Sequence, residues 1–151
     1  MRISPGSTVN GIEEDDTDVL YPALVNRLKG LGPACLHVVH ADPGTAVYRR
    51  IRADWPGVLI GNPVLPALTT EAVTGAATGM PASGADPVAL GRPFLAHPDL
   101  VTRLRLGVPL NPVRDRYLMY AGGADGYSDH PALDGQPSSD SIVALDAGRV
   151  A

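Results

Sequence analysis

The stretch that decides the fold of this chain begins at residue 84 and reads Gly84-Ala-Asp-Pro-Val-Ala-Leu-Gly91-Arg92-Pro93-Phe94. Its first half predicts a short buried strand, and the following Leu95-Ala-His-Pro-Asp-Leu100 predicts a helix. Gly91 allows the backbone to approach a ligand closely because it has no Cβ. Arg92 adds a planar, permanently charged fork that suits a phosphate, and a helix N-terminus attracts anions. The stretch therefore predicts an anion-binding turn at the carboxyl end of a strand.

The composition is that of one globular domain. The chain has 151 residues, 44% of them hydrophobic and 19% charged, with a net charge of −4. This charge argues against nucleic acid and an anionic membrane surface as partners. Cys35 is the only cysteine, so no intrachain disulfide can form, and we interpret it as a small buried hydrophobe. Neither a membrane span nor a secretory leader is evident, so we expect no membrane partner and a cytoplasmic location.

Upstream of residue 84, short apolar runs alternate with helical patterns. We expect strands at residues 2–5, 34–39 and 58–62, and helices at 18–29, 46–55 and 69–79. With the strand at 84–90 these make four β-loop-α units, which predicts an α/β fold with a parallel sheet. An open doubly wound sheet and part of a (β/α)8 TIM barrel both fit this order. No Gly-x-Gly-x-x-Gly turn follows a strand, and Gly61-Asn62 and Gly91-Arg92 end consecutive strands, which favours the barrel.

For three of the expected helices, the spacing of the residues predicts which side is buried or exposed. An apolar face on the first helix comprises Leu20, Leu24, Leu28 and Leu31. A solvated basic face on the second comprises Arg49, Arg50 and Arg52. The packing stripe of the last helix comprises Leu100, Val101 and Leu104.

No metal site is expected from the titratable residues. His37 and His40 are three residues apart on a strand, a spacing that does not put both side chains on one face. We expect each histidine to be packed or hydrogen-bonded. The acidic run at residues 13–16 precedes a helix, where carboxylates complement the positive end of the helix dipole.

Four segments, in this order, resemble the carboxyl-terminal half of the old yellow enzyme family, FMN-dependent ene-reductases and NAD(P)H:flavin oxidoreductases on a (β/α)8 barrel. They are Arg2-Ile-Ser-Pro5, Gly57-Val-Leu-Ile-Gly-Asn-Pro63, the stretch from Gly84 to Leu100, and Tyr120-Ala-Gly-Gly-Ala-Asp-Gly-Tyr-Ser-Asp-His-Pro131. The third segment is the most specific. The resemblance covers residues 1–133 and implies barrel strands 5–8 with their helices, followed by a flexible tail at residues 134–151.

The resemblance also implies a cofactor site. Arg2 would end the fifth strand and meet the flavin ring near N1 and O2, stabilising negative charge in the reduced cofactor. Gly61 and Asn62 on strand seven, and Gly91 and Arg92 on strand eight, would hold the FMN phosphate.

The chain departs from the family pattern at several of these positions. Many relatives have two glycines where this chain has Gly61-Asn62. Tyr120 would lie at the substrate mouth, beside Met119 in place of the usual Phe. His97 replaces the Asn of Asn-Pro-Asp-Leu, and His130, in place of Tyr, is expected to be a surface substitution and not a catalytic base.

The expected function follows from what the matched half contains. The family takes its flavin-edge contacts, a substrate-anchoring His-His or His-Asn pair and a proton-donating Tyr from strands one to four, which we do not find. The strand at Arg2 also reads as cut at its amino end, because a core strand normally has about five or six residues.

We therefore expect no catalytic residue in this chain. It would be a fragment of an FMN-dependent NAD(P)H oxidoreductase that contributes the FMN phosphate site and is inactive alone, with NADH or NADPH as the family's reductant. The alternative of another class is a half-barrel module that binds FMN or another phosphate and pairs with a separate half or with itself. A non-functional remnant is the third reading.

Overall fold

The computed structural model describes residues 1–112, 114, 115, 117–121 and 123–133, so the predicted tail at 134–151 lies outside the described residues. The chain forms two compact units, Met1–Gly91 and Arg92–Ala151. We call them the sheet unit and the carboxyl unit.

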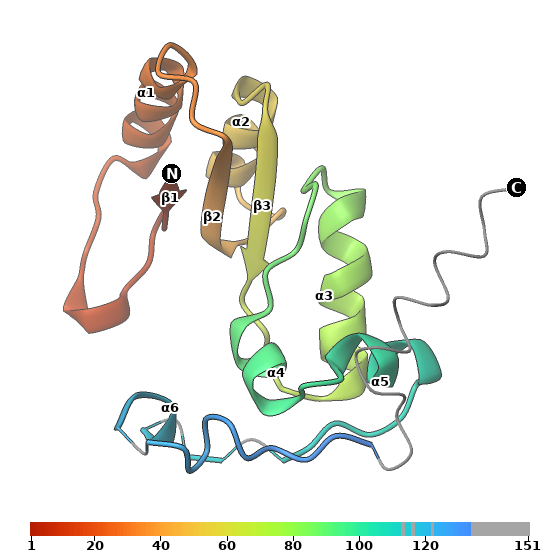
Figure 1. Cartoon of the computed structure of the whole chain (residues 1–151). Helices are drawn as coiled ribbons and strands as arrows, with labels where there is room; N and C mark the ends of the chain where they lie inside the picture. The colour runs from red at the N-terminus through yellow and green to blue at the C-terminus, as the bar shows by residue number, and fades with distance from the viewer. Residues whose placement is uncertain (113, 116, 122, 134–151) are drawn as a thin grey trace, which may run out of the picture. The chain divides into compact units, whose positions relative to one another are not determined.

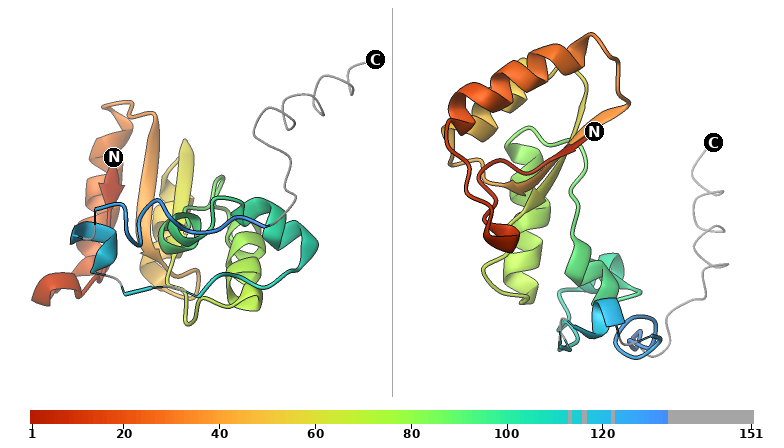
Figure 2. Two further views of the ribbon diagram at one scale, coloured as in Figure 1. Left: turned by 60° about the horizontal axis from the view of Figure 1, so that its bottom comes forward. Right: turned by 90° about the vertical axis from the view of Figure 1, so that its left-hand side faces the viewer.

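The sheet unit is built on three parallel strands that lie side by side in the order β1-β2-β3 (Figures 1 and 2). They are β1 (Arg2–Ile3), β2 (Cys35–Ala41) and β3 (Val58–Pro63). Arg2 pairs with His37, and His37 pairs in turn with Ile60. The register shifts between Val39 and Ala41, where His40 has a φ of 56°. The predicted parallel α/β arrangement is confirmed.

Helices connect these strands and pack on one face of the sheet. They are α1 (Thr17–Lys29), α2 (Ala46–Asp54) and α3 (Thr70–Ala82), and a short 3-10 turn, η1 (Val9–Gly11), precedes α1. Thr45 and Thr69 cap α2 and α3, since their hydroxyls accept the amides of Tyr48 and Ala72. Two successive right-handed crossovers in one direction place α1 and α2 on the same side, where they share one core.

The core of the sheet unit lies between that face and the helices. From the strands it contains Ile3, Leu36, Val38 and Leu59, and from α1 and α2 it contains Tyr21, Val25, Leu28, Tyr48 and Ile51. The predicted leucine face of α1 is therefore right for Leu24 and Leu28, which pack in or against this core, and wrong for Leu20 and Leu31, which are 51% and 78% exposed. Steps of four residues advance about 40° around a helix, so a stripe of leucines four apart runs obliquely out of the contact.

The opposite face of the sheet has no helix of the sheet unit on it. Side chains alternate along a strand, so this open face carries Arg2, Cys35, His37, Val39, Ile60 and Asn62. Arg2 is exposed, and most of the others are partly exposed. The open face is the side on which chemistry-bearing residues of neighbouring strands lie together.

The predicted fourth strand is an extended segment that follows β3 without becoming a regular strand. The Asp86 amide donates to Leu59 O over 2.8 Å, Gly61 to Pro87 O over 3.0 Å, and Ala89 to Gly61 O over 2.8 Å. The only bridge of this segment joins Gly61 and Val88 in parallel. Pro87 has no N–H to donate, which interrupts the ladder.

The carboxyl unit contains short helices and long connections. They are α4 (Gly91–Ala96), whose first residue belongs to the sheet unit, α5 (Leu100–Leu106) and α6 (Leu118–Ala121). The predicted stripe on α5 is partly wrong, since Leu100 is buried but Val101 is 46% exposed. Arg103 is buried instead, because Asp99 one turn earlier neutralises its charge.

Candidate functional site

Gly61, predicted to help bind phosphate, is buried at the carboxyl end of β3. A Cβ on Gly61 would lie 2.4 Å from Met80 Cε and 3.1 Å from Ala85 Cβ. Its amide already donates to Pro87 O, and its carbonyl accepts the Ala89 amide. Packing against α3 is therefore sufficient to require a glycine here.

Asn62, the neighbouring predicted residue, joins the ends of β3 and the 84–90 segment. Its Nδ2 donates to Ala89 O over 2.9 Å. This bond, with those of Gly61, brings Gly61 and Asn62 beside the residues that lead into Gly91. Within the sheet unit the structure thus groups three of the predicted residues at one edge of the sheet.

Gly91 differs from Gly61 in its surroundings. Apart from its chain neighbours and the backbone of its own helix, no described atom lies within 4 Å of the position that a Cβ on Gly91 would take. Arg92, the next residue and the first of the carboxyl unit, is exposed, and its guanidinium makes no hydrogen bond or ion pair with any described residue. Both residues therefore have features that an anion could use, a backbone without a Cβ at Gly91 and an exposed guanidinium at Arg92.

Arg2 lies on the open face of the sheet beside His37. The His37 Nε2 atom is buried and has no hydrogen-bond partner among the described residues. Burial lowers the pKa of His37, and the positive charges of Arg2 and the N-terminal ammonium lower it further. His37 is packed, as expected, but not hydrogen-bonded through Nε2. Neutral His37 beside cationic Arg2 makes this part of the face a place for a hydrogen-bonding or negatively charged group.

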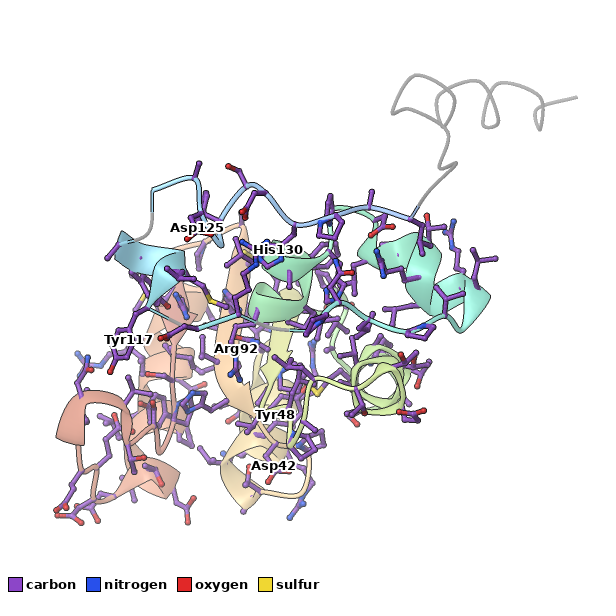
Figure 3. All side chains as sticks on the ribbon, turned by 90° about the horizontal axis from the view of Figure 1, so that it is seen from below. Asp42, Tyr48, Arg92, Tyr117, Asp125 and His130 are labelled. Carbon is purple, nitrogen blue, oxygen red and sulfur yellow. The ribbon has the colours of Figure 1, made fainter. Side chains whose placement is uncertain are left out.

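Tyr120 projects from α6 in the carboxyl unit and is 90% exposed. The loop around it is tied by Arg114, which pairs with Asp125 at 2.9 Å and with Asp129 at 2.6 Å. Tyr117, Asp125 and His130 mark this loop in Figure 3. His130 is buried, and its Nε2 contacts Gly126 O at 3.1 Å. The prediction of a surface position for His130 is therefore wrong, because the Gly126 turn folds over the ring.

Arg52 has a structural role that the sequence did not indicate. Its Nη1 donates to Gly84 O over 3.1 Å and contacts Asp86 Oδ2 at 3.4 Å, and its Nη2 donates to Trp55 O. Asp86 Oδ2 also accepts the Leu59 amide over 2.8 Å. Arg52 therefore ties α2 to the 84–86 turn, contrary to the prediction of a solvated face. It was missed because a basic run on a helix shows no sign of a distant partner.

A groove of about 500 Å³ lies along α3 near the carboxyl ends of β2 and β3. Its lining is mostly small and apolar, from Ala72, Gly75, Ala76 and Gly79, with Asp42 as its charged residue. The groove contains none of the predicted site residues. In the described part of the chain no three metal-ligating side chains cluster together, and none of the helices there is long and apolar enough to cross a membrane.

The sequence of this chain is similar to those of known reductases. No protein-family model matches the chain. It is 31% identical over 136 residues to a probable flavin mononucleotide-dependent alkene reductase of Leishmania infantum, covering 88% of this chain and 35% of that protein. It is 55% identical to putative 12-oxophytodienoate reductase 12 of Oryza sativa subsp. japonica, covering 89% of this chain and 35% of that protein.

Solved structures agree with the sequence comparison. The structure of morphinone reductase in complex with tetrahydroNAD matches with a TM-score of 0.71 and 33% identity, over 89% of this chain and 35% of that one. The chain thus spans about 35% of the length of the relatives it matches. On both sequence and structure, it belongs to the old yellow enzyme family, as a partial homologue of its full-length members.

Proposed function

We propose that this chain supplies strands 5–8 of an FMN-dependent ene-reductase barrel and, with them, the site for the FMN phosphate. β1, β2, β3 and the 84–90 segment would be these four strands in order. FMN, when bound, would supply hydride transfer to an activated alkene, with NADH or NADPH as reductant. The chain spans about 35% of the length of these relatives, and we propose this reaction for the whole barrel and not for the chain alone.

The observation that carries this proposal is the pair Gly91 and Arg92. The position of a Cβ on Gly91 is open, and the guanidinium of the next residue, Arg92, has no charged partner among the described residues. Ligands of parallel α/β proteins bind at the carboxyl ends of the strands, which is where the 84–90 segment ends. The fit to a phosphate is therefore good at this turn, where a backbone can approach closely and a guanidinium can bind two oxygens.

The other predicted residues take different parts in the proposal. Asn62 would hold the residues before Gly91 in place through its hydrogen bond to Ala89 O. Gly61 would act by leaving room for Met80 and not by binding phosphate, because its amide already donates to Pro87 O. Arg2 would place a fixed positive charge next to the flavin ring. Tyr120, with its exposed side chain, would contact the substrate.

Titration with FMN and with riboflavin, which lacks the phosphate, tests the proposal through flavin fluorescence. We expect FMN to bind in the micromolar range and Arg92→Ala to weaken it about tenfold or more, the loss of one charge-assisted contact. Riboflavin affinity should be the same for both proteins. Arg105→Ala is the matched control, because Arg105 is also an exposed arginine of the carboxyl unit. Absence of FMN binding at high micromolar concentration, or equal losses for both ligands, would contradict the assignment.

A second candidate function is a half-barrel that acts as a binding or assembly module. The open face supports it, because Val58 on that face is 45% exposed and His37 Nε2 has no partner among the described residues. Such a face is normally covered in a barrel. Sedimentation of the chain alone, and with the unmatched part of a full-length relative, is the test. A monomer that associates with neither itself nor that polypeptide would exclude this candidate.

A further inference from the structure

His97 is a buried histidine with both ring nitrogens in use. It is 1% exposed and lies just after α4. Nδ1 lies 2.6 Å from Pro93 O, and the backbone amide of Asn111 donates to Nε2 over 2.7 Å. Pro93 O can only accept and the Asn111 amide can only donate, so the contacts define the proton positions. His97 must be neutral, with its hydrogen on Nδ1.

The contacts around His97 hold the two ends of a long loop. Asn111 Nδ2 donates to Ala96 O and to Pro131 O, both over 2.9 Å. Arg103 donates to Pro109 O over 3.0 Å and to Pro131 O over 3.1 Å. The start and the end of the segment from Asn111 to Pro131 are therefore attached to the same short helices. We call this segment the clasped loop.

The clasped loop displays aromatic side chains. Tyr117, Tyr120 and Tyr127 are 66%, 90% and 56% exposed. Inside the loop, Arg114 pairs with Asp125 and Asp129, and the Gly126 amide donates to Asp129 Oδ1 over 2.8 Å. The loop thus has its own internal contacts, and the hydrogen bonds at its ends attach it to the short helices.

We propose that His97 is a positioning residue that holds the clasped loop when it is neutral and loosens it when it is protonated. A second ring proton on Nε2 would face the N–H of Asn111, so the bond would be lost and two donors would confront each other. That this loop carries a ligand contact, Tyr120, rests on the proposed function. The pH-dependent attachment itself rests on the geometry of His97.

The charged groups near His97 do not duplicate its effect. Among the described residues, the charged and titratable groups on the helices and loop of the carboxyl unit are Arg92, Asp99, Arg103, Arg105, Arg114, Asp115, Asp125, Asp129 and His130, with the phenols of Tyr117, Tyr120 and Tyr127. Asp99 pairs with Arg103 at 2.7 Å, and Arg114 pairs with Asp125 and Asp129. The His130 Nε2 contact is to a carbonyl, Gly126 O, so that nitrogen donates in either protonation state and keeps its bond.

Amide hydrogen exchange between pH 7.5 and pH 5 tests the proposal on the chain without ligand. The pH range is that in which histidines change charge. After correction for intrinsic exchange rates, we expect protection of the Asn111 amide in the wild type to fall about tenfold on acidification. His97→Asn should remove this fall, because an Asn amide offers the same acceptor and donor without titrating. His97→Ala should lower protection at both pH values.

Control measurements separate His97 from other effects. His130→Gln should retain the wild-type pH dependence at Asn111. An equal pH-dependent loss in His97→Asn would overturn the proposal. Should His97→Asn fail to fold, the ¹⁵N shifts of the wild-type ring decide instead, since a hydrogen on Nε2 at neutral pH would also overturn it. None of these measurements uses FMN. A failed FMN titration would therefore contradict the proposed function without contradicting the role of His97.

Discussion

The two units of this chain are stabilised in different ways. The sheet unit buries a continuous apolar core between β2, β3, α1 and α2, in which Leu36, Ile51 and Leu59 have no exposed surface. Among its described residues the carboxyl unit has few such side chains, and it is held by hydrogen bonds of the buried His97 and Arg103 and of the half-buried Asn111. Burial of apolar surface stabilises without regard to direction. A buried polar group, in contrast, lowers the stability of the fold if its hydrogen-bond partner is lost.

Single substitutions of polar residues should therefore lower the stability of the carboxyl unit more than that of the sheet unit. Asp99 and Arg103 form a pair whose side chains are only 9% and 6% exposed. Burial opposes ionisation of Asp99, but hydrogen bonds from Arg103 and the Leu133 amide outweigh it and lower its pKa. The stability it contributes is therefore present above the unfolded-state pKa and is lost as pH falls through the folded-state value.

Arg103→Met should have the largest effect, because it leaves the Asp99 carboxylate buried without its partner. We expect the carboxyl unit to lose about 3–5 kcal/mol. Amide exchange at Leu133 and Asn111 would report the loss, while the Leu59 amide in the sheet unit keeps its protection. Arg105→Met is the matched control on the exposed side of α5. Equal losses in both units would contradict separate stabilisation.

Gly61→Ala should come next, because the new Cβ would meet Met80 and Ala85 in a packed core. We expect overpacking to cost the sheet unit about 1–3 kcal/mol, as measured by urea unfolding. Gly91→Ala is the matched control, since its Cβ meets nothing and a helical alanine is preferred by about 0.5–1 kcal/mol. A larger cost at Gly91 than at Gly61 would reverse our account of the two glycines.

His37→Leu should stabilise the sheet unit in acid by about 1 kcal/mol, because it removes a buried ring nitrogen that has no partner among the described residues. The pKa of His37 is lowered in the folded state, so the unfolded chain takes up the proton first. Stability is thus lost as pH falls below the ordinary histidine pKa. Urea unfolding followed at pH 7.5 and pH 5 should show a smaller pH dependence in the variant. An unchanged pH dependence would show that His37 finds a partner.

Tyr48→Phe should have the smallest effect, a change of less than about 1 kcal/mol that leaves the sheet unit unchanged or slightly more stable. Its hydroxyl is buried without a partner in the described chain, and burial raises its pKa. Tyr21→Phe is the contrast. Its hydroxyl donates to Glu14 over 2.7 Å, and burial with that carboxylate raises its pKa to about 12. Thermal unfolding should show Tyr21→Phe to be the more damaging.

Much of the sheet unit could be predicted from sequence, because short-range patterns report its elements. The apolar runs around Leu36 and Leu59 became β2 and β3, and the helix expected from residue 18 became α1. The face of α1 could not be predicted, because leucine spacing does not say which side meets the sheet. The order of the strands was enough to predict that Gly61, Asn62 and Gly91 lie near one another. It was not enough to predict that Gly61 is required by packing against Met80 whereas Gly91 is not.

By itself the sequence determined the parallel β-loop-α order, the family and the Gly91-Arg92 pair, although these two residues begin α4 and do not form the predicted turn. Each depends on neighbours along the chain or on a motif of fixed spacing. Only the tertiary structure decided that Arg103 is buried, that His97 holds Asn111, and that Gly61 faces Met80 while Gly91 faces open space. These depend on partners brought together by folding. A polar side chain or a glycine carries no sign in the sequence of what will lie against it.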